Sequence, residues 1–343
     1  MGDHRVLMAV LTQLNEDQLA QWLPQYRIGE LSEFQQISTG IENSNYFVNT
    51  TDTTDVHRWV VTILEQDYAS RDLLVPLTNT LHKAGLPVPR ILPNTNGETV
   101  VPLAGKPAIL STRLPGAHPV NPNLSQCAAI GRFLACFHRA GQNARTQAKQ
   151  FARDQAWLSA KAKQVMSYLP FDEQSLLKRS LQHLDSLLNR GDLTTLPIGV
   201  VHGDLFRDNT LFNDQGLSGV LDFHHAGEHF LLFDIAVVAN DWCTDNEGNL
   251  DTERCVSMLT AYNNERALTT EELWFLPLFM IYSATAFWLS RLGAKYPPPG
   301  QPPAARKNPE EFRAIVERRC GQFFYLDQRL LQRSRKFAAA ASV

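Results

Sequence analysis

Alternating apolar and polar positions dominate the first third of the chain. This period-two pattern is typical of strands with one buried face, and turn-rich residues separate one run from the next. Two further strand-like segments flank the Asn96-Gly97 turn. The pattern predicts a five-stranded antiparallel sheet within residues 1–110, whose first three strands are residues 31–38, 43–50 and 57–65.

Helical spacing takes over elsewhere. Residues 15–26 have Asn15 as an N-cap and apolar side chains three and four positions apart, which predicts a short helix. Residues 70–84 predict a second helix that ends at Gly85. From residue 124 onward helical patterns dominate, over 124–140, 151–190, 250–265, 273–292 and from Pro309 after the N-cap Asn308.

A change of character at residues 111–118 separates these two regions. The stretch STRLPGAH holds a proline and a glycine and fits neither periodicity. We therefore predict an α+β protein of two lobes: an N-lobe over residues 1–110, a hinge crossover at 111–118, and a helical C-lobe over 119–343.

Composition narrows the class of protein. The net charge of −3 and the absence of a basic patch argue against a nucleic-acid partner. The most apolar stretch, 273–292, contains Pro277, Ser283 and Ser290, so we expect a buried core helix and no membrane partner. The five cysteines form no CxxC pair, which fits a reducing compartment. We expect a cytoplasmic enzyme.

The chemistry is concentrated in VVHGDLFRDNTLFNDQGLSGVLDF, residues 200–223. Asn209 follows Asp204 by five positions, and Asp222 lies 18 positions after Asp204 at the end of an apolar run. Phosphoryl transfer needs a carboxylate that orients the attacking hydroxyl and hard oxygen ligands for Mg²⁺. The order and spacing Asp-x-x-x-x-Asn followed by Asp-Phe match those of kinases. Two other interpretations are solvated turn residues, or a metal cluster that includes His224 and His225.

This stretch and several others resemble the homoserine kinases of the aminoglycoside-phosphotransferase-like superfamily. The similar segments are HGDLFRDNTLF, GVLDFHHAGEHFLLFDIAVVANDWC, AFWLSRL, TGIENSNYFV and KPAILSTRLPGAHP, and together they span almost the whole chain. The resemblance implies a two-lobed protein-kinase-like fold, use of ATP and Mg²⁺, and phosphorylation of the side-chain hydroxyl of L-homoserine in threonine synthesis.

The resemblance also implies roles for individual residues. Asp204 corresponds to the catalytic base, and Asn209 and Asp222 correspond to the Mg²⁺ ligands. The nucleotide-phosphate loop corresponds to Gly40, Ile41, Glu42, Asn43, Ser44 and Asn45, and it contains a single glycine. Thr62 stands where many kinases place a phosphate-binding lysine, so the cation that steadies the phosphates is open, with Lys83 and Lys106 as possibilities.

A homoserine pocket must hold an ammonium and a carboxylate. A carboxylate or an aromatic face suits the first, and the forked donors of arginine suit the second. Asp241, Trp242 and Arg291 are the candidates, with Arg291 expected to bind the substrate carboxylate. A packing or intraprotein ion-pair role is the alternative for each, and Glu228 and Arg113 are weaker candidates.

Three other polar residues near the motif are expected to be structural. His202 should hydrogen-bond the backbone of the catalytic loop, His138 should be a packed core histidine, and Asp234 should brace the loop or cap its helix. Two other functions remain open: a kinase for another amino-alcohol such as choline or an aminoglycoside, and a non-catalytic nucleotide-binding protein.

Overall fold

The computed structural model describes residues 12–37, 43–65, 71–147, 149–189, 191–299 and 307–321. Its N-terminal part is an antiparallel sheet with the strand order β1-β2-β3-β6-β4, in which β5 also pairs with β6. Burial alternates along β2, as the period-two pattern predicts. The strands are β1 Glu30–Ile37, β2 Ser44–Thr51, β3 Val56–Ile63, β4 Ile91–Leu92, β5 Val101–Leu103 and β6 Lys106–Thr112.

The prediction of five strands was one strand short, because the sheet in the described part of the chain has six. The two segments around Asn96 and Gly97 do not pair with each other, because β4 and β5 each pair with β6. The tight hairpin lies instead at Ala104 and Gly105, whose φ angles are 51° and 77°. Positive φ at both central residues matches the twist of the flanking strands, so this turn closes the β5–β6 hairpin.

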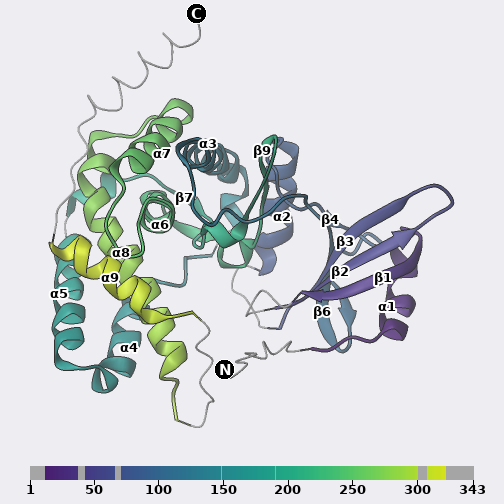
Figure 1. Cartoon of the computed structure of the whole chain (residues 1–343), viewed down its shortest axis with the longest axis horizontal. Helices are drawn as coiled ribbons and strands as arrows, with labels where there is room; N and C mark the ends of the chain where they lie inside the picture. The colour runs from purple at the N-terminus through teal and green to yellow at the C-terminus, as the bar shows by residue number, and fades with distance from the viewer. Residues whose placement is uncertain are drawn as a thin grey trace, which may run out of the picture.

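The C-terminal part is mainly helical and lies at the other end of the molecule (Figure 1). Pro170 separates two helices within the stretch 151–190, where it serves as the N-cap of the second. The helices of the chain are α1 Glu16–Trp22, α2 Arg71–Lys83, α3 Leu124–Gly141, α4 Gln155–Val165, α5 Phe171–Leu188, α6 Leu232–Trp242, α7 Thr252–Glu265, α8 Thr270–Lys295 and α9 Pro309–Gly321.

Two hydrophobic clusters stabilise these parts. The smaller one joins α1 to one face of the sheet through side chains such as Leu19, Tyr46 and Val61. The larger one fills the helical part and includes Leu77 and Leu81 of α2, so α2 packs against the helices, between them and the sheet in Figure 1. The boundaries of the predicted lobes at 110 and 118 stay a prediction.

Helix α8 runs through the larger cluster. By length and composition it could cross a membrane, with a mean hydropathy of 1.5 in its most apolar window, but 83% of that window is buried inside the protein. Such burial is typical of a core helix, as the sequence predicted.

Four short strands complete the frame of the site: β7 Ile198–Val201, β8 Thr210–Asn213, β9 Gly216–Val220 and β10 Gly227–Phe230. Strand β7 pairs with β10, and β8 pairs with β9, both antiparallel. The segment after β6 joins this frame, because Ala117 and Phe212 exchange two backbone hydrogen bonds of 2.9 Å.

Candidate active site

The loop between β7 and β8 holds Asp204 and Asn209 together. The Asn209 side-chain amide donates to the Asp204 backbone carbonyl at 2.7 Å and to its carboxylate at 3.1 Å. Gly203 adopts φ 79°, and a Cβ at this position would lie 2.4 Å from the Phe151 ring. Only glycine therefore lets the loop pack this closely against the core. The structure brings the predicted base and the first predicted metal ligand into contact.

Asp222 comes to the same place from the end of β9, the second strand of the hairpin that follows Asn209. His202 links the two segments, since its Nε2 lies 3.0 Å from the carbonyl oxygen of Leu221. Burial raises the pKa of Asp204; the charges of His225 and Arg153 oppose this rise, and the negative charge of Asp222 adds to it. Asp222 itself has φ 64°, a left-handed conformation that costs energy in a non-glycine residue. Such strain often occurs at functional sites.

The oxygen groups of Asn209 and Asp222 fit a magnesium ion. Mg²⁺ prefers hard oxygen ligands and is usually held by one or two carboxylates together with substrate phosphates. Within the described residues, no three His, Cys, Asp or Glu side chains come together as a metal-binding group. The alternative of a metal cluster that includes His224 and His225 therefore has no support in this part of the chain.

Asp234, in the first turn of helix α6, holds the start of the catalytic loop. This fully buried carboxylate accepts from the backbone N–H of His202 at 2.6 Å and from that of Gly203 at 2.8 Å. The His138 ring lies 3.2 Å away, and Tyr262 holds the other ring nitrogen at 2.8 Å. Burial lowers the pKa of His138, which keeps the ring neutral. The expected structural roles of His202, His138 and Asp234 are confirmed.

The C-terminal end of α6 holds the same loop further along. Asp241 accepts from the Arg207 backbone N–H at 2.7 Å and from its Nε at 3.2 Å. Burial raises the pKa of Asp241 to about 6, and Arg207 opposes that rise. Trp242 is fully buried and its Nε1 donates to the Leu205 carbonyl at 3.2 Å. For these two predicted substrate residues, the structure shows the intraprotein roles that the sequence left as the alternative.

Arg291 also has an intraprotein partner. Its Nη1 donates to the Glu311 carboxylate at 2.6 Å and to the Asn308 carbonyl at 2.7 Å, and its guanidinium carbon lies 4.5 Å from the centre of the Phe312 ring. Arg291 therefore forms the intraprotein ion pair that the sequence left as the alternative to binding the substrate carboxylate.

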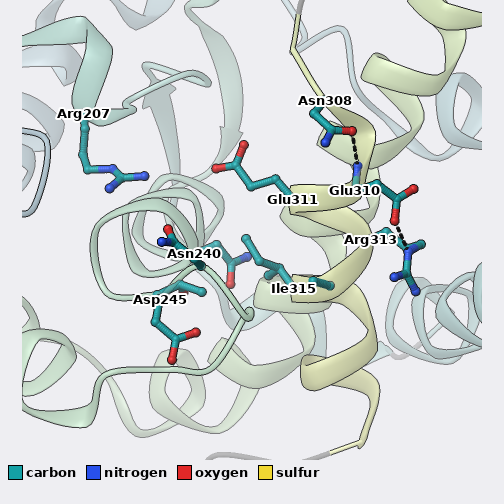
Figure 2. Close-up of a pocket in the computed structure, with 11 residues that line it drawn as sticks. Arg207, Asn240, Asp245, Asn308, Glu310, Glu311, Arg313 and Ile315 are labelled. Carbon is teal, nitrogen blue, oxygen red and sulfur yellow. Dashed lines mark hydrogen bonds and ion pairs between the residues drawn. The ribbon is translucent and has the colours of Figure 1, made fainter.

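A polar pocket of about 440 Å³ lies between the catalytic loop and α9. Figure 2 shows Arg207 and Glu311 pointing toward one another from opposite sides of it, above Asn240 and Asp245. The lining residues do not include Asp204, Asn209 or Asp222, so the predicted reacting groups lie outside this pocket.

The predicted phosphate loop is described only in part. Gly40, Ile41 and Glu42 lie outside the described residues, whereas Asn43, Ser44 and Asn45 lie within them. The Asn45 side chain accepts a hydrogen bond from the Thr62 hydroxyl at 2.7 Å. The end of the predicted phosphate loop therefore contacts Thr62, the position where many kinases have a phosphate-binding lysine.

Lys106 lies beside this loop. It forms an ion pair with Glu65, and the Ser44 hydroxyl donates to the same carboxylate at 2.5 Å. Which cation steadies the phosphates therefore stays a prediction.

Sequence reasoning missed two cations near Asp204. Arg153 donates to the Gly203 carbonyl at 3.0 Å. Lys307 pairs with Asp208 at 2.6 Å; burial acts to lower the Lys307 pKa, but the negative charge of Asp208 and its hydrogen bond with Lys307 outweigh burial and raise that pKa. Both lie far from the motif in sequence, so spacing gave no signal for either; Lys307 is 99 positions from Asp208.

Comparison with known proteins agrees with this geometry. The model of the phosphotransferase enzyme family matches residues 33–268. A homoserine kinase of Cupriavidus necator is 36% identical over 321 residues, which cover 92% of this chain and 97% of that protein. A homoserine kinase of Methylobacillus flagellatus is 37% identical over 312 residues, with 90% and 95% covered.

Solved structures share the fold at lower identity. The amicoumacin kinase hAmiN, in complex with AMP-PNP, Ca²⁺ and Ami, superimposes with a TM-score of 0.65 at 16% identity; the match covers 89% of this chain and 93% of that one. A microcompartment-associated aminopropanol kinase has the same TM-score at 18% identity, with 90% and 95% covered. With a family match over most of the chain and close relatives of nearly equal length, this protein belongs to the phosphotransferase enzyme family and is a small-molecule kinase.

Proposed function

We propose that the protein is a homoserine kinase, which transfers the γ-phosphoryl group of ATP to the side-chain hydroxyl of L-homoserine and so forms O-phospho-L-homoserine for threonine synthesis. The observation that carries the proposal is a catalytic loop with Asp204 and Asn209 in contact, in a chain more than a third identical to homoserine kinases over nine-tenths of its length.

The geometry supports a direct transfer. The Asp204 carboxylate would accept the hydroxyl proton of homoserine while the hydroxyl oxygen bonds to the γ-phosphorus and the bond to the leaving ADP oxygen breaks. Burial raises the Asp204 pKa, which increases its affinity for that proton. Asn209 positions the carboxylate through the 3.1 Å contact.

Asn209 and Asp222 are the residues that would hold Mg²⁺, which supplies positive charge at the phosphates when bound. Asn209 and Asp222 flank the same β8–β9 hairpin, where the Leu221 N–H donates to the Asn209 carbonyl at 2.8 Å, so both could act on one nucleotide. Asn43, Ser44 and Asn45 would contact its phosphates from the sheet. We place this activity in the cytoplasm.

A substrate screen tests the proposal. ADP release by the purified protein is measured with ATP and Mg²⁺ against L-homoserine, choline, L-serine and kanamycin, and the product is identified by ³¹P NMR. We expect homoserine to give the highest kcat/KM. A higher value for choline or kanamycin would assign another amino-alcohol substrate, and no ADP release with any alcohol would favour a non-catalytic nucleotide-binding protein.

A further inference from the structure

Arg153 is a buried cation directly beneath the catalytic loop. It lies between η2, Gln142–Gln147, and α4, and its relative exposure is 9%. Its guanidinium carbon lies 4.5 Å from the centre of the Phe287 ring, and its Nη1 donates to the carbonyl oxygen of Gly203, next to Asp204. Tyr282 fixes the backbone, because its hydroxyl donates to the Arg153 carbonyl at 2.8 Å.

This charge has no acidic ion-pair partner in the part of the chain that the structure describes. Other partly or fully buried arginines there do have one: Arg207 pairs with Asp241, Arg266 with Glu272 and Arg291 with Glu311. Arg319 is also without one, but its three nitrogens are engaged by Asn240, Gly248 and Thr244. A buried charge without a partner is costly, and an anionic ligand would compensate that cost.

The position and the free donors of Arg153 indicate the kind of ligand that it could bind. Its Nη1 bonds to the carbonyl oxygen of Gly203, the residue immediately before Asp204, which would receive the hydroxyl proton. Only one of the five N–H donors of its guanidinium is used in the bonds that the described residues make. Two parallel donors of a guanidinium match the two oxygens of a carboxylate.

We propose that Arg153 binds the α-carboxylate of the amino-acid substrate whose hydroxyl is presented to Asp204. This inference rests on the proposed function. It replaces Arg291 in that role, because the Arg291 guanidinium already binds Glu311 and Asn308 in the folded protein.

The γ-phosphate of ATP has the same anionic oxygens and is the other possible ligand. The carboxylate is favoured because Arg153 packs on Phe287 of α8 and approaches the loop from the helical part, whereas the predicted nucleotide loop belongs to the sheet. The substrate must enter opposite the nucleotide for the oxygen to attack in line.

Two variants test the proposal, Arg153→Gln and Arg153→Lys. Each is assayed with L-homoserine and with 3-amino-1-propanol, which is homoserine without its carboxylate. We expect kcat/KM for homoserine to fall about 100-fold in Arg153→Gln, because a charge-assisted bidentate contact is lost. The KM for ATP should change less than about threefold, and the activity on 3-amino-1-propanol should fall far less than that on homoserine, because there only the contact with the Gly203 carbonyl is lost. Arg153→Lys should fall nearly as far, since an ammonium cannot reproduce the fork.

Arg139→Gln is the matched control, because the Arg139 side chain is 62% exposed and pairs only with Glu265 at the surface. Melting temperatures are recorded for all variants. If Arg153→Gln does not fold, Arg153→Lys is the variant compared, because it keeps the charge and the packed stem.

Equal losses on both alcohols, or a rise in the KM for ATP in place of that for homoserine, would overturn the proposal and assign Arg153 to loop packing or to the γ-phosphate. These results differ from a failure of the proposed function, in which the unsubstituted protein itself would not phosphorylate homoserine.

Discussion

Replacing Asp234 by asparagine should damage both stability and catalysis. The Asp234 carboxylate is fully buried and receives three donors: two backbone N–H groups of the catalytic loop, at 2.6 Å and 2.8 Å, and the His138 ring at 3.2 Å. An asparagine side chain has one acceptor oxygen, and its amide would face one of those N–H groups as a second donor. Losing one partner of a buried charged network costs about 3–5 kcal/mol.

The same change should displace the loop that carries Asp204. Because the two N–H groups belong to His202 and Gly203, immediately before Asp204, any shift that relieves the donor–donor contact moves the catalytic carboxylate. We expect kcat to fall at least about tenfold, since misplacement of about 1 Å is enough to cost up to 100-fold.

Urea unfolding followed by tryptophan fluorescence measures the stability, because Trp242 and Trp288 are fully buried in the helical part. Asp72→Asn is the matched control: the Asp72 side chain is 77% exposed and its ion pair with Lys149 should contribute less than about 1 kcal/mol. If Asp234→Asn unfolds within about 1 kcal/mol of the unsubstituted protein and keeps its kcat, Asp234 does not brace the loop and the reasoning fails.

Three further predictions follow from the site. Asp204→Asn should lower kcat about 100- to 10,000-fold while ATP affinity, measured by calorimetry, stays within a few fold; a variant that keeps a tenth of the activity would exclude Asp204 as the base. Asn209→Ala and Asp222→Asn should both raise the Mg²⁺ concentration needed for half-maximal rate, with excess Mg²⁺ restoring Asn209→Ala far more than Asp222→Asn; an unchanged Mg²⁺ titration in both would remove them as ligands. The pKa of Asp241 is raised from an ordinary 3.8 to about 6, so between these pH values the folded protein holds a proton on Asp241 that the unfolded chain has lost. The contribution of Asp241 to the free energy of unfolding therefore decreases as pH rises from about 4 to about 6, and it is constant above that range. Asp241→Asn should flatten that slope in urea unfolding at a series of pH values, and an unaltered slope would contradict the assignment.

The sequence alone determined the class of fold and predicted the reacting groups. Period-two alternation and helical spacing record which side chains must be buried, and the core forms where those patterns place it, as in β2 and α3. Asp204 and Asn209 lie in one loop and Asp222 follows the β8–β9 hairpin, so short local connections bring these three predicted residues together and a sequence pattern can identify them.

Long-range pairing was decided only in the tertiary structure. Strands β4 and β5 each pair with β6, so the Asn96-Gly97 turn between them does not determine their partner. The partners of charged groups behave in the same way: Asp241 and Arg291 carry chemistry that suits a substrate, yet Arg207 and Glu311 bind them from 34 and 20 positions away.

Arg153 shows the converse. Its surrounding sequence, FARDQAW, has no spacing relation to the catalytic motif, and its neighbour Gly203 is 50 positions away. Which side chains lose their water and which charges remain without a partner depends on every element packed around them. For that reason the sequence could predict a local catalytic motif, whereas only the packed structure shows the buried cation beneath it.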